Sequence, residues 1–199
     1  MPALAAARLP ELIGADDVVG VAWGLTLKAT ADALRPLALG TPVVQICGAV
    51  PGVGGGTGPS EVAYLVAERL GGSLHTLPAP ALASEAARDE LLRNDAVRPT
   101  VERFADVTIA LVGIGATPAG APADAAGHVL VHVFDANGHV LPSDLRAIAM
   151  PLEQLRAARV VAVAGGREKH AAILGALRGG HVDVLVTDEE SARYALEAA

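Results

Sequence analysis

The chain has 199 residues and a formal net charge of −7, and 52% of it is hydrophobic although only 3% is aromatic. This length suits one α/β domain whose core is built from Ala, Val, Leu and Ile. The negative charge argues against direct DNA binding, which depends on Lys and Arg at the phosphates. Cys47 is the only cysteine, which excludes an internal disulfide and suits a reducing compartment. We find no signal peptide and no membrane-spanning run, so we expect a cytoplasmic protein that does not contact a membrane.

Helical and strand patterns alternate through the first half of the chain. Residues 3–13 have the apolar spacing of an amphipathic helix, and the β-branched run at 18–23 predicts the first strand. The patterns that follow predict a helix over 26–37 in which Pro36 interferes, then a strand over 43–47, a glycine-rich loop over 48–58, a helix over 59–70, a short strand over 73–77 and helices over 84–93 and 96–105.

The second half repeats this alternation around one antiparallel feature. Residues 129–141 alternate in polarity up to Asn137-Gly138, a strong hairpin signal, and so predict a β-hairpin. The other patterns predict a strand over 107–112, a surface loop over 116–127, a helix over 152–157, a strand over 160–164, a helix over 168–177, a strand over 182–186 and a helix over 189–197. Because unbroken apolar strands alternate with helices, we predict an α/β fold, a three-layer, Rossmann-like, mostly parallel sheet with a β-hairpin insertion.

In such a sheet, ligands bind at the loops that follow the carboxyl ends of the strands. The five loops are Trp23-Gly24-Leu25-Thr26, residues 48–58, Gly113-Ile114-Gly115-Ala116-Thr117, Gly165-Gly166-Arg167-Glu168-Lys169 and Thr187-Asp188-Glu189. Glycine in four of them lets backbone N–H groups approach an anion, and the helix that follows adds the positive end of its dipole. Thr26 adds a hydroxyl group and Lys169 a charge, so phosphate suits these loops best. Glycine at such turns is also explained by turn formation alone, and Lys169 by a solvated surface position.

Other chemistries have weaker support in the sequence. The glycines at 52–58 lack the Lys-Ser/Thr ending of a P-loop, so we expect no nucleotide cofactor. Alternation places His128 and His132 on one face of the hairpin, but no further ligands have convincing spacing, so we expect solvated histidines and no metal. His75, Asp188 and Glu189 are the only candidates for a general base near strand ends, and each has a structural explanation.

Nearly the whole chain resembles the effector-binding domain of SorC/DeoR-type sugar regulators, whose fold is similar to that of sugar isomerases and CoA-transferases. The resemblance is carried by short motifs in a fixed order, namely residues 20–26, 45–48, Glu61 with 67–72, 78–82, 111–115, 134–138, 163–166 with Lys169, and 175–180 through 183–189. It implies a non-enzymatic domain that binds a phosphorylated sugar or related metabolite and forms a homo-oligomer, a dimer or tetramer. It also implies that DNA is contacted only through a helix-turn-helix module, which we do not find here.

We therefore interpret residues 1–199 as a single effector-binding domain, truncated at its N-terminus, either naturally or by excision. The expected ligand-binding residues are Trp23, Gly24, Leu25, Thr26, Gly48, Glu61, Gly113, Gly115, Gly165, Gly166, Lys169, Asp188 and Glu189.

Several positions depart from the family pattern. Leu25 replaces a residue that is usually polar or basic, Ser60 replaces Asn, and His128 stands where an acidic residue is frequent near the hairpin. The segment between Gly115 and Gly127 is shorter than usual, which removes part of the pocket lid. Two alternatives therefore remain open. One is a sugar-phosphate isomerase or deaminase, and the other is a ligand-free dimerisation module.

Overall fold

The structure, a computed structural model, describes residues 1–50, 58–118, 120–142 and 146–198. Its centre is a six-stranded parallel sheet in the order β11-β10-β5-β1-β2-β3. The strands are β1 (Val19–Val21), β2 (Val43–Gln45), β3 (Leu74–His75), β5 (Ile109–Val112), β10 (Arg159–Val163) and β11 (Val184–Val186). Val19 of β1 is in register with Val43 of β2 on one side and with Ile109 of β5 on the other. The predicted α/β fold with a mostly parallel sheet is confirmed.

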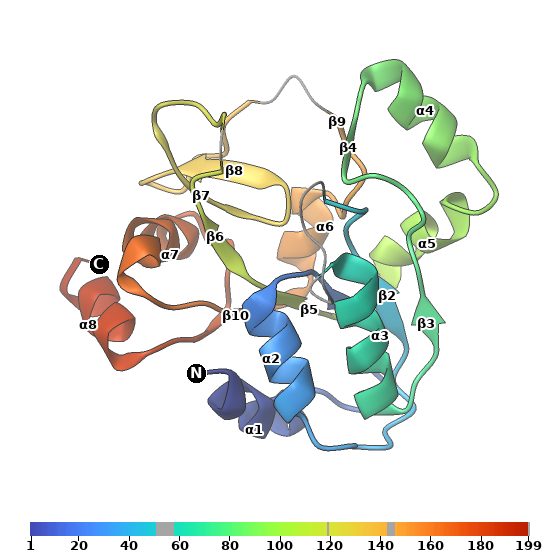
Figure 1. The fold of residues 1–199 in the computed structure, drawn as a ribbon, viewed down its shortest axis with the longest axis horizontal. Helices are drawn as coiled ribbons and strands as arrows, with labels where there is room; N and C mark the ends of the chain where they lie inside the picture. The colour runs from blue at the N-terminus through green and yellow to red at the C-terminus, as the bar shows by residue number, and fades with distance from the viewer. Residues whose placement is uncertain (51–57, 119, 143–145, 199) are drawn as a thin grey trace.

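Helices cover both faces of this sheet. They are α1 (Pro2–Leu12), α2 (Leu25–Ala33), α3 (Pro59–Leu70), α4 (Glu85–Arg93), α5 (Arg98–Glu102), α6 (Leu152–Ala157), α7 (His170–Arg178) and α8 (Glu189–Ala198), with two 3-10 helices, η1 (Arg103–Asp106) and η2 (Arg167–Lys169). Figure 1 shows α1, α2 and α3 in front of the sheet and α6 behind it, so the sheet is the middle layer. No helix among the described residues is long and apolar enough to cross a membrane.

The core explains why the strands are unbroken apolar runs. Every residue of β1, β2 and β5 is buried, because helices cover the sheet on both sides.

Two predicted helices differ in extent from the observed ones. α2 ends at Ala33, before Pro36, the residue that was expected to interfere with this helix. The helix predicted over 96–105 is divided into α5 and η1.

Antiparallel strands lie above the carboxyl ends of the central strands (Figure 1). They form a three-stranded sheet of β6 (Ile114–Ala116), β7 (Ala125–Val129) and β8 (His132–Asp135), and a pair of β4 (Leu82–Ala83) and β9 (Arg146–Ala147). Sequence patterns did not predict β4, β6 or β9, which are only two or three residues long. The loop predicted over 116–127 ends in β7.

The hairpin prediction is right in place and wrong in its main turn. The chain reverses between β7 and β8 at residues 130–131, where Leu130 has a φ of 52°. The Asn137-Gly138 turn exists as a second reversal, held by the isolated bridge between Phe134 and Val140. In the observed register His128 pairs with Val133 and Val129 with His132, so His128 and His132 lie on opposite faces rather than on one.

Candidate functional site

The order in which the chain adds strands to the central sheet reverses between β1 and β5. The chain moves outward from β1 to β2 and β3 on one side, and from β5 to β10 and β11 on the other. Loops that follow two such neighbouring strands diverge, which leaves a crevice at their carboxyl ends. A cavity of about 410 Å³ opens there. It is lined by Ala22, Trp23, Gly24, Leu25, Thr26, Leu27, Gly113, Ile114, Gly115, His128, Leu130, Val163, Glu168 and Lys169.

The start of α2 forms one wall of the cavity. Gly24 is the N-cap residue, with φ 120° and ψ 163°, a backbone conformation that is essentially restricted to glycine. The backbone N–H groups of Leu25, Thr26 and Leu27 come in the first turn and have no partner within the helix. Because these N–H groups and the helix dipole are both positive, this wall favours an anionic group.

The segment η2 forms a second wall and contributes two charges. Lys169 is half-buried and forms no salt bridge with any residue in the described ranges. Glu168, its exposed neighbour, also lines the cavity. The cavity therefore offers a cation next to a carboxylate, a pair that can bind an anionic group and a hydroxyl group respectively.

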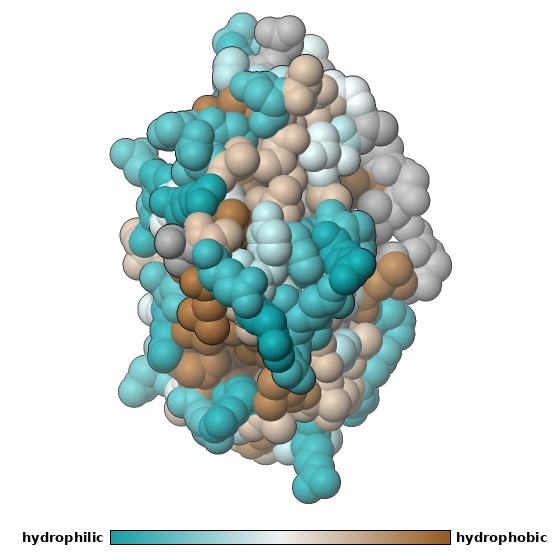
Figure 2. Space-filling view, turned by 90° about the vertical axis from the view of Figure 1, so that its left-hand side faces the viewer, coloured by the Kyte–Doolittle hydropathy of each residue, from teal (hydrophilic) through white to brown (hydrophobic). Residues whose placement is uncertain are grey.

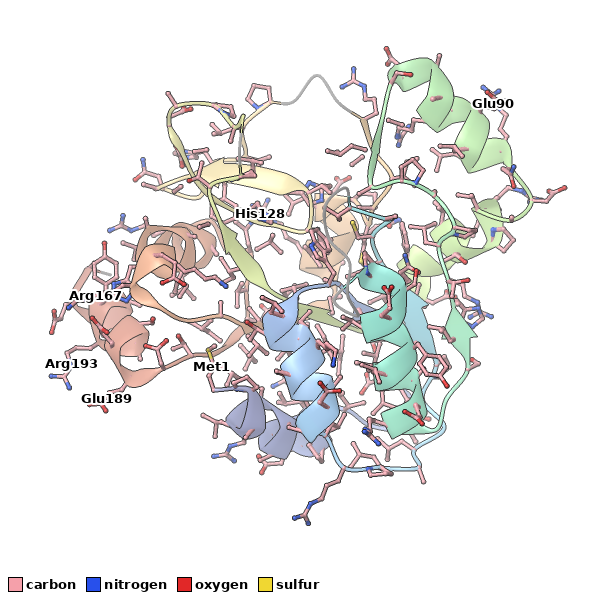
Figure 3. The ribbon with its side chains drawn as sticks, in the orientation of Figure 1. Met1, Glu90, His128, Arg167, Glu189 and Arg193 are labelled. Atoms are coloured by element: carbon pink, nitrogen blue, oxygen red, sulfur yellow. The ribbon has the colours of Figure 1, made fainter. Side chains whose placement is uncertain are left out.

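The hairpin β7–β8 brings His128, a residue of β7, to the cavity, and Figure 3 labels it next to β6. Its ring is stacked on Trp23, with ring centroids 6.4 Å apart. A Cβ atom on Gly115 would lie 2.0 Å from Nε2 of His128, so glycine is needed at position 115 for this close approach. Burial lowers the pKa of His128, and the positive charge of Lys169 lowers it further.

Seven predicted site residues come together in this cavity. They are Trp23, Gly24, Leu25, Thr26, Gly113, Gly115 and Lys169. The remaining six do not line it, namely Gly48, Glu61, Gly165, Gly166, Asp188 and Glu189. That any of these residues binds a ligand stays a prediction.

Two of the six lie along β2 and α3. Gly48 donates its backbone N–H to the carbonyl oxygen of Ile148 at 3.0 Å, which joins the end of β2 to a neighbouring segment. Glu61 is in the first turn of α3 and lines a separate open hollow beside Lys28 and Tyr64. The part of the glycine-rich loop at residues 51–57 lies outside the described residues.

The other four belong to a junction between η2 and α8. Oδ2 of Asp188 accepts a hydrogen bond from the backbone N–H of Gly166 at 2.8 Å, and Oδ1 accepts one from Ser191 N–H at 2.9 Å. These hydrogen bonds, from Ser191 first, hold the pKa of Asp188 below its ordinary value. Gly165 lies against the Asp188 carboxylate. Asp188 therefore caps α8 and fastens the preceding loop.

Glu189 points away from the cavity. Its carboxylate is exposed and forms a salt bridge with Arg193 at 2.8 Å, one helical turn along α8. Figure 3 shows both residues at the outer edge of the molecule, far from His128. Such an exposed pair is explained by helix stabilisation.

Sequence patterns missed His128 and Glu168 as cavity residues. His128 was considered as a solvated hairpin histidine and as a departure from the family pattern, and its position depends on the turn at residues 130–131. Glu168 immediately precedes Lys169, and this adjacency is the one signal that could have indicated it.

The candidate general bases of the enzyme alternative are not cavity residues. Asp188 and Glu189 have the roles just described, and His75 lies in β3 at the far edge of the sheet. Cys47 is buried, and burial raises the pKa of its thiol to about 12, so it is no ready nucleophile. The described residues contain no group of three or more His, Cys, Asp or Glu side chains that could hold a metal ion.

A second hollow, the α1–β11 groove, lies on the face that carries α1 and α8. Figure 2 shows apolar atoms gathered there between polar ones. The groove has a volume of about 530 Å³ and runs along β11, which is an edge of the central sheet. It is lined by Leu4, Arg8, Glu11, Leu12, Val184, Leu185, Val186, Thr187 and Ala192. None of the predicted site residues lines it.

The chain is similar to known regulators over nearly its whole length. Residues 1–197 match the protein family described as "Putative sugar-binding domain". The deoxyribonucleoside regulator of Bacillus subtilis is 29% identical over 204 residues, which cover 92% of this chain and 65% of that protein. The sorbitol operon regulator of Klebsiella pneumoniae is 30% identical over 220 residues, which cover 94% of this chain and 67% of that protein.

The fold is also that of a solved regulator. The crystal structure of the full-length sorbitol operon regulator SorC from Klebsiella pneumoniae superimposes with a TM-score of 0.90 at 24% identity, over 98% of this chain and 70% of that one. The chain thus spans about two thirds of the length of its curated relatives, which are transcriptional regulators and not enzymes. The chain belongs to the family of sugar-binding domains of SorC/DeoR-type transcriptional regulators.

Proposed function

We propose that the cavity between β1, β5 and β10 binds a phosphorylated sugar or a related carbohydrate. The observation that carries this proposal is that Lys169 and the start of α2 line the same cavity of about 410 Å³. Both attract an anionic group such as a phosphate. Glu168, His128 and the Thr26 hydroxyl can bond sugar hydroxyl groups, and Trp23 offers an apolar ring face for the sugar ring.

We propose further that ligand binding here controls the oligomeric state and the DNA binding of a transcriptional regulator. Relatives named after deoxyribonucleosides, erythritol and sorbitol support a carbohydrate ligand. The net charge of −7 supports DNA contact through a separate helix-turn-helix module rather than through these residues.

Thermal-shift measurements test the ligand. The panel pairs ribose 5-phosphate, glucose 6-phosphate and fructose 6-phosphate with the three unphosphorylated sugars, and adds inorganic phosphate. A ligand present at 100 times its Kd stabilises the folded protein by about 2.7 kcal/mol, which corresponds to a rise in Tm of roughly 5–10 °C for a protein of this size. We expect at least one sugar phosphate to raise Tm. No shift with any compound would overturn the proposal.

Lys169→Met tests the assigned phosphate site. Removal of the cation should reduce the shift from the sugar phosphate much more than the shift from its unphosphorylated partner. Lys28→Met is the matched control, because Lys28 lies on α2 outside the cavity, in a salt bridge with Asp32. Equal effects of the two substitutions would contradict the assignment of Lys169.

We also propose that the domain self-associates through the α1–β11 groove. Support comes from the apolar lining of the groove and from its position along an edge strand, a surface that commonly pairs with another chain. Light scattering coupled to size-exclusion chromatography, with and without the sugar phosphate, measures the oligomeric state. A strictly monomeric protein at all concentrations would refute self-association.

A further inference from the structure

The hydrogen bond at one ring nitrogen of His128 determines whether the other nitrogen acts as a donor or as an acceptor. Nδ1 lies 2.8 Å from the carbonyl oxygen of Leu130. A carbonyl oxygen can only accept, so Nδ1 must carry the proton. In the neutral ring Nε2 is then unprotonated and acts as a hydrogen-bond acceptor.

The residue that carries this acceptor atom lines the cavity. Nε2 is the ring atom closest to the Cβ position of Gly115, another residue of the cavity wall. No donor within the described residues forms a hydrogen bond to Nε2. Nε2 is not among the described buried side-chain atoms that lack a partner, so it remains accessible and can accept a hydrogen bond from a ligand.

Burial of the ring, together with the charge of Lys169, favours the neutral form of His128. Lys169 and Glu168 line the cavity from η2, and Trp23 and Thr26 line it just before and within the first turn of α2. From β6 come Ile114 and Gly115, which carry no charge. Burial first and Lys169 second lower the pKa of His128, and these effects exceed the opposite effect of the Leu130 hydrogen bond.

We propose that His128 is a specificity-determining residue that accepts a hydrogen bond from a hydroxyl group of the ligand. A phosphate dianion has no proton to donate, so this acceptor disfavours phosphate at His128 and directs it to Lys169 and the start of α2. The cavity thereby selects a polyhydroxylated ligand and sets its orientation. This inference rests on the proposed function and names the residue that recognises a hydroxyl group of the ligand.

Two substitutions separate the roles of the ring nitrogens. Asn in His128→Asn can place its amide N–H near the Nδ1 position and retain the bond to Leu130, but has no atom at the Nε2 position. Gln in His128→Gln reaches the Nε2 position and can present its carbonyl oxygen there. Titration calorimetry uses the sugar phosphate that gives the largest thermal shift. We expect His128→Asn to weaken binding by about three- to tenfold, the value of one hydrogen bond, and His128→Gln to retain most of the affinity.

The pH dependence provides a second readout. Acidification protonates Nε2 and turns the acceptor into a donor, so binding of the unphosphorylated sugar by the wild-type protein should change as the pH falls through the folded pKa of His128, which lies below the ordinary histidine value. The His128→Asn protein should not show this dependence. If His128→Asn binds with unchanged affinity and an unchanged pH profile, the inference is wrong while the proposed function stands.

A measurement without ligand tests the tautomer directly. Nitrogen-15 NMR of histidine-labelled protein at about pH 7.5, above the ordinary histidine pKa, distinguishes the two neutral forms, and the signal lost in His128→Asn identifies the residue. A protonated Nδ1 supports the inference, and a protonated Nε2 overturns it whatever binds. If no compound of the panel binds the wild-type protein, the proposed function and this inference fall together.

Discussion

Substitution of Asp188 by alanine should lower the stability of the folded protein without reducing ligand binding in the cavity. The Asp188 carboxylate accepts hydrogen bonds from Gly166 N–H at 2.8 Å, from Ser191 N–H at 2.9 Å and from Ser191 Oγ at 3.1 Å. Asp188→Ala removes the cap of α8 and the link to the loop after β10. Since Asp188 does not line the cavity, ligand affinity should change little.

The magnitude follows from these contacts. Loss of an N-cap side chain costs about 0.5–2 kcal/mol. Gly166 N–H keeps a second acceptor, Ser191 Oγ at 3.2 Å, so it is not left without a partner. We therefore expect a loss of about 2 kcal/mol in the free energy of unfolding, or roughly 4–8 °C in Tm for a protein of this size. Thermal and urea unfolding measure both quantities.

Two variants control this experiment. Glu189→Ala removes only an exposed i,i+4 pair, worth about 0.3–0.5 kcal/mol, so Tm should change by less than about 2 °C. Asp188→Asn keeps a good N-cap residue and should be less harmful than Asp188→Ala. If Asp188→Ala is as stable as Glu189→Ala but no longer binds the sugar phosphate, Asp188 acts on the ligand and the structural assignment is refuted.

Acidity gives a further check on Asp188. Its pKa is lowered in the folded protein, so its contribution to stability is complete above the ordinary pKa of an aspartate and is lost as pH falls through the folded value. The difference in unfolding free energy between wild type and Asp188→Ala should therefore shrink in acid.

Three other outcomes are expected. Burial lowers the pKa values of His128, His132 and His181 in the folded protein. As the pH decreases from about 7 to 5, these histidines therefore bind protons in the unfolded chain at a higher pH than in the folded protein, and Tm should fall. A Tm that does not change with pH would contradict this. Gly24→Ala should cost about 1–3 kcal/mol because of the glycine-only backbone conformation, and an unchanged urea midpoint would refute that reason. Leu4 is 51% exposed in the α1–β11 groove, so Leu4→Glu should weaken self-association in light scattering while leaving Tm nearly unchanged at protein concentrations too low for association.

Local patterns predicted most helices and the central strands, since burial on both faces requires a continuous apolar run. The same reasoning failed at the hairpin. Asn137-Gly138 is a strong local turn signal, yet the main reversal occurs at residues 130–131, where Leu130 adopts a positive φ that no local preference favours. Pairing of β7 with both β6 and β8 decides this register.

For the candidate site, sequence reasoning predicted glycine loops after strand ends but could not tell which of these loops share one cavity. Glycine turns follow β1, β2, β5 and β10, and all of them were expected to suit an anion, with Thr26 and Lys169 as additional groups in two of them. Gly24 and Lys169 line the cavity because β1 and β10 both lie next to β5. Gly48 and Asp188 do not line it, since β2 and β11 lie one strand further out on either side.

The sequence by itself therefore determined the layered α/β fold, the positions of the phosphate-suited turns and the family resemblance. These depend on hydrophobic periodicity, turn chemistry and motif order, which can be recognised in short stretches of the sequence. Only the tertiary structure decided which turns share one cavity and that His128 joins them. Those features depend on the strand order and on a hairpin register set by long-range pairing, which no local pattern contains.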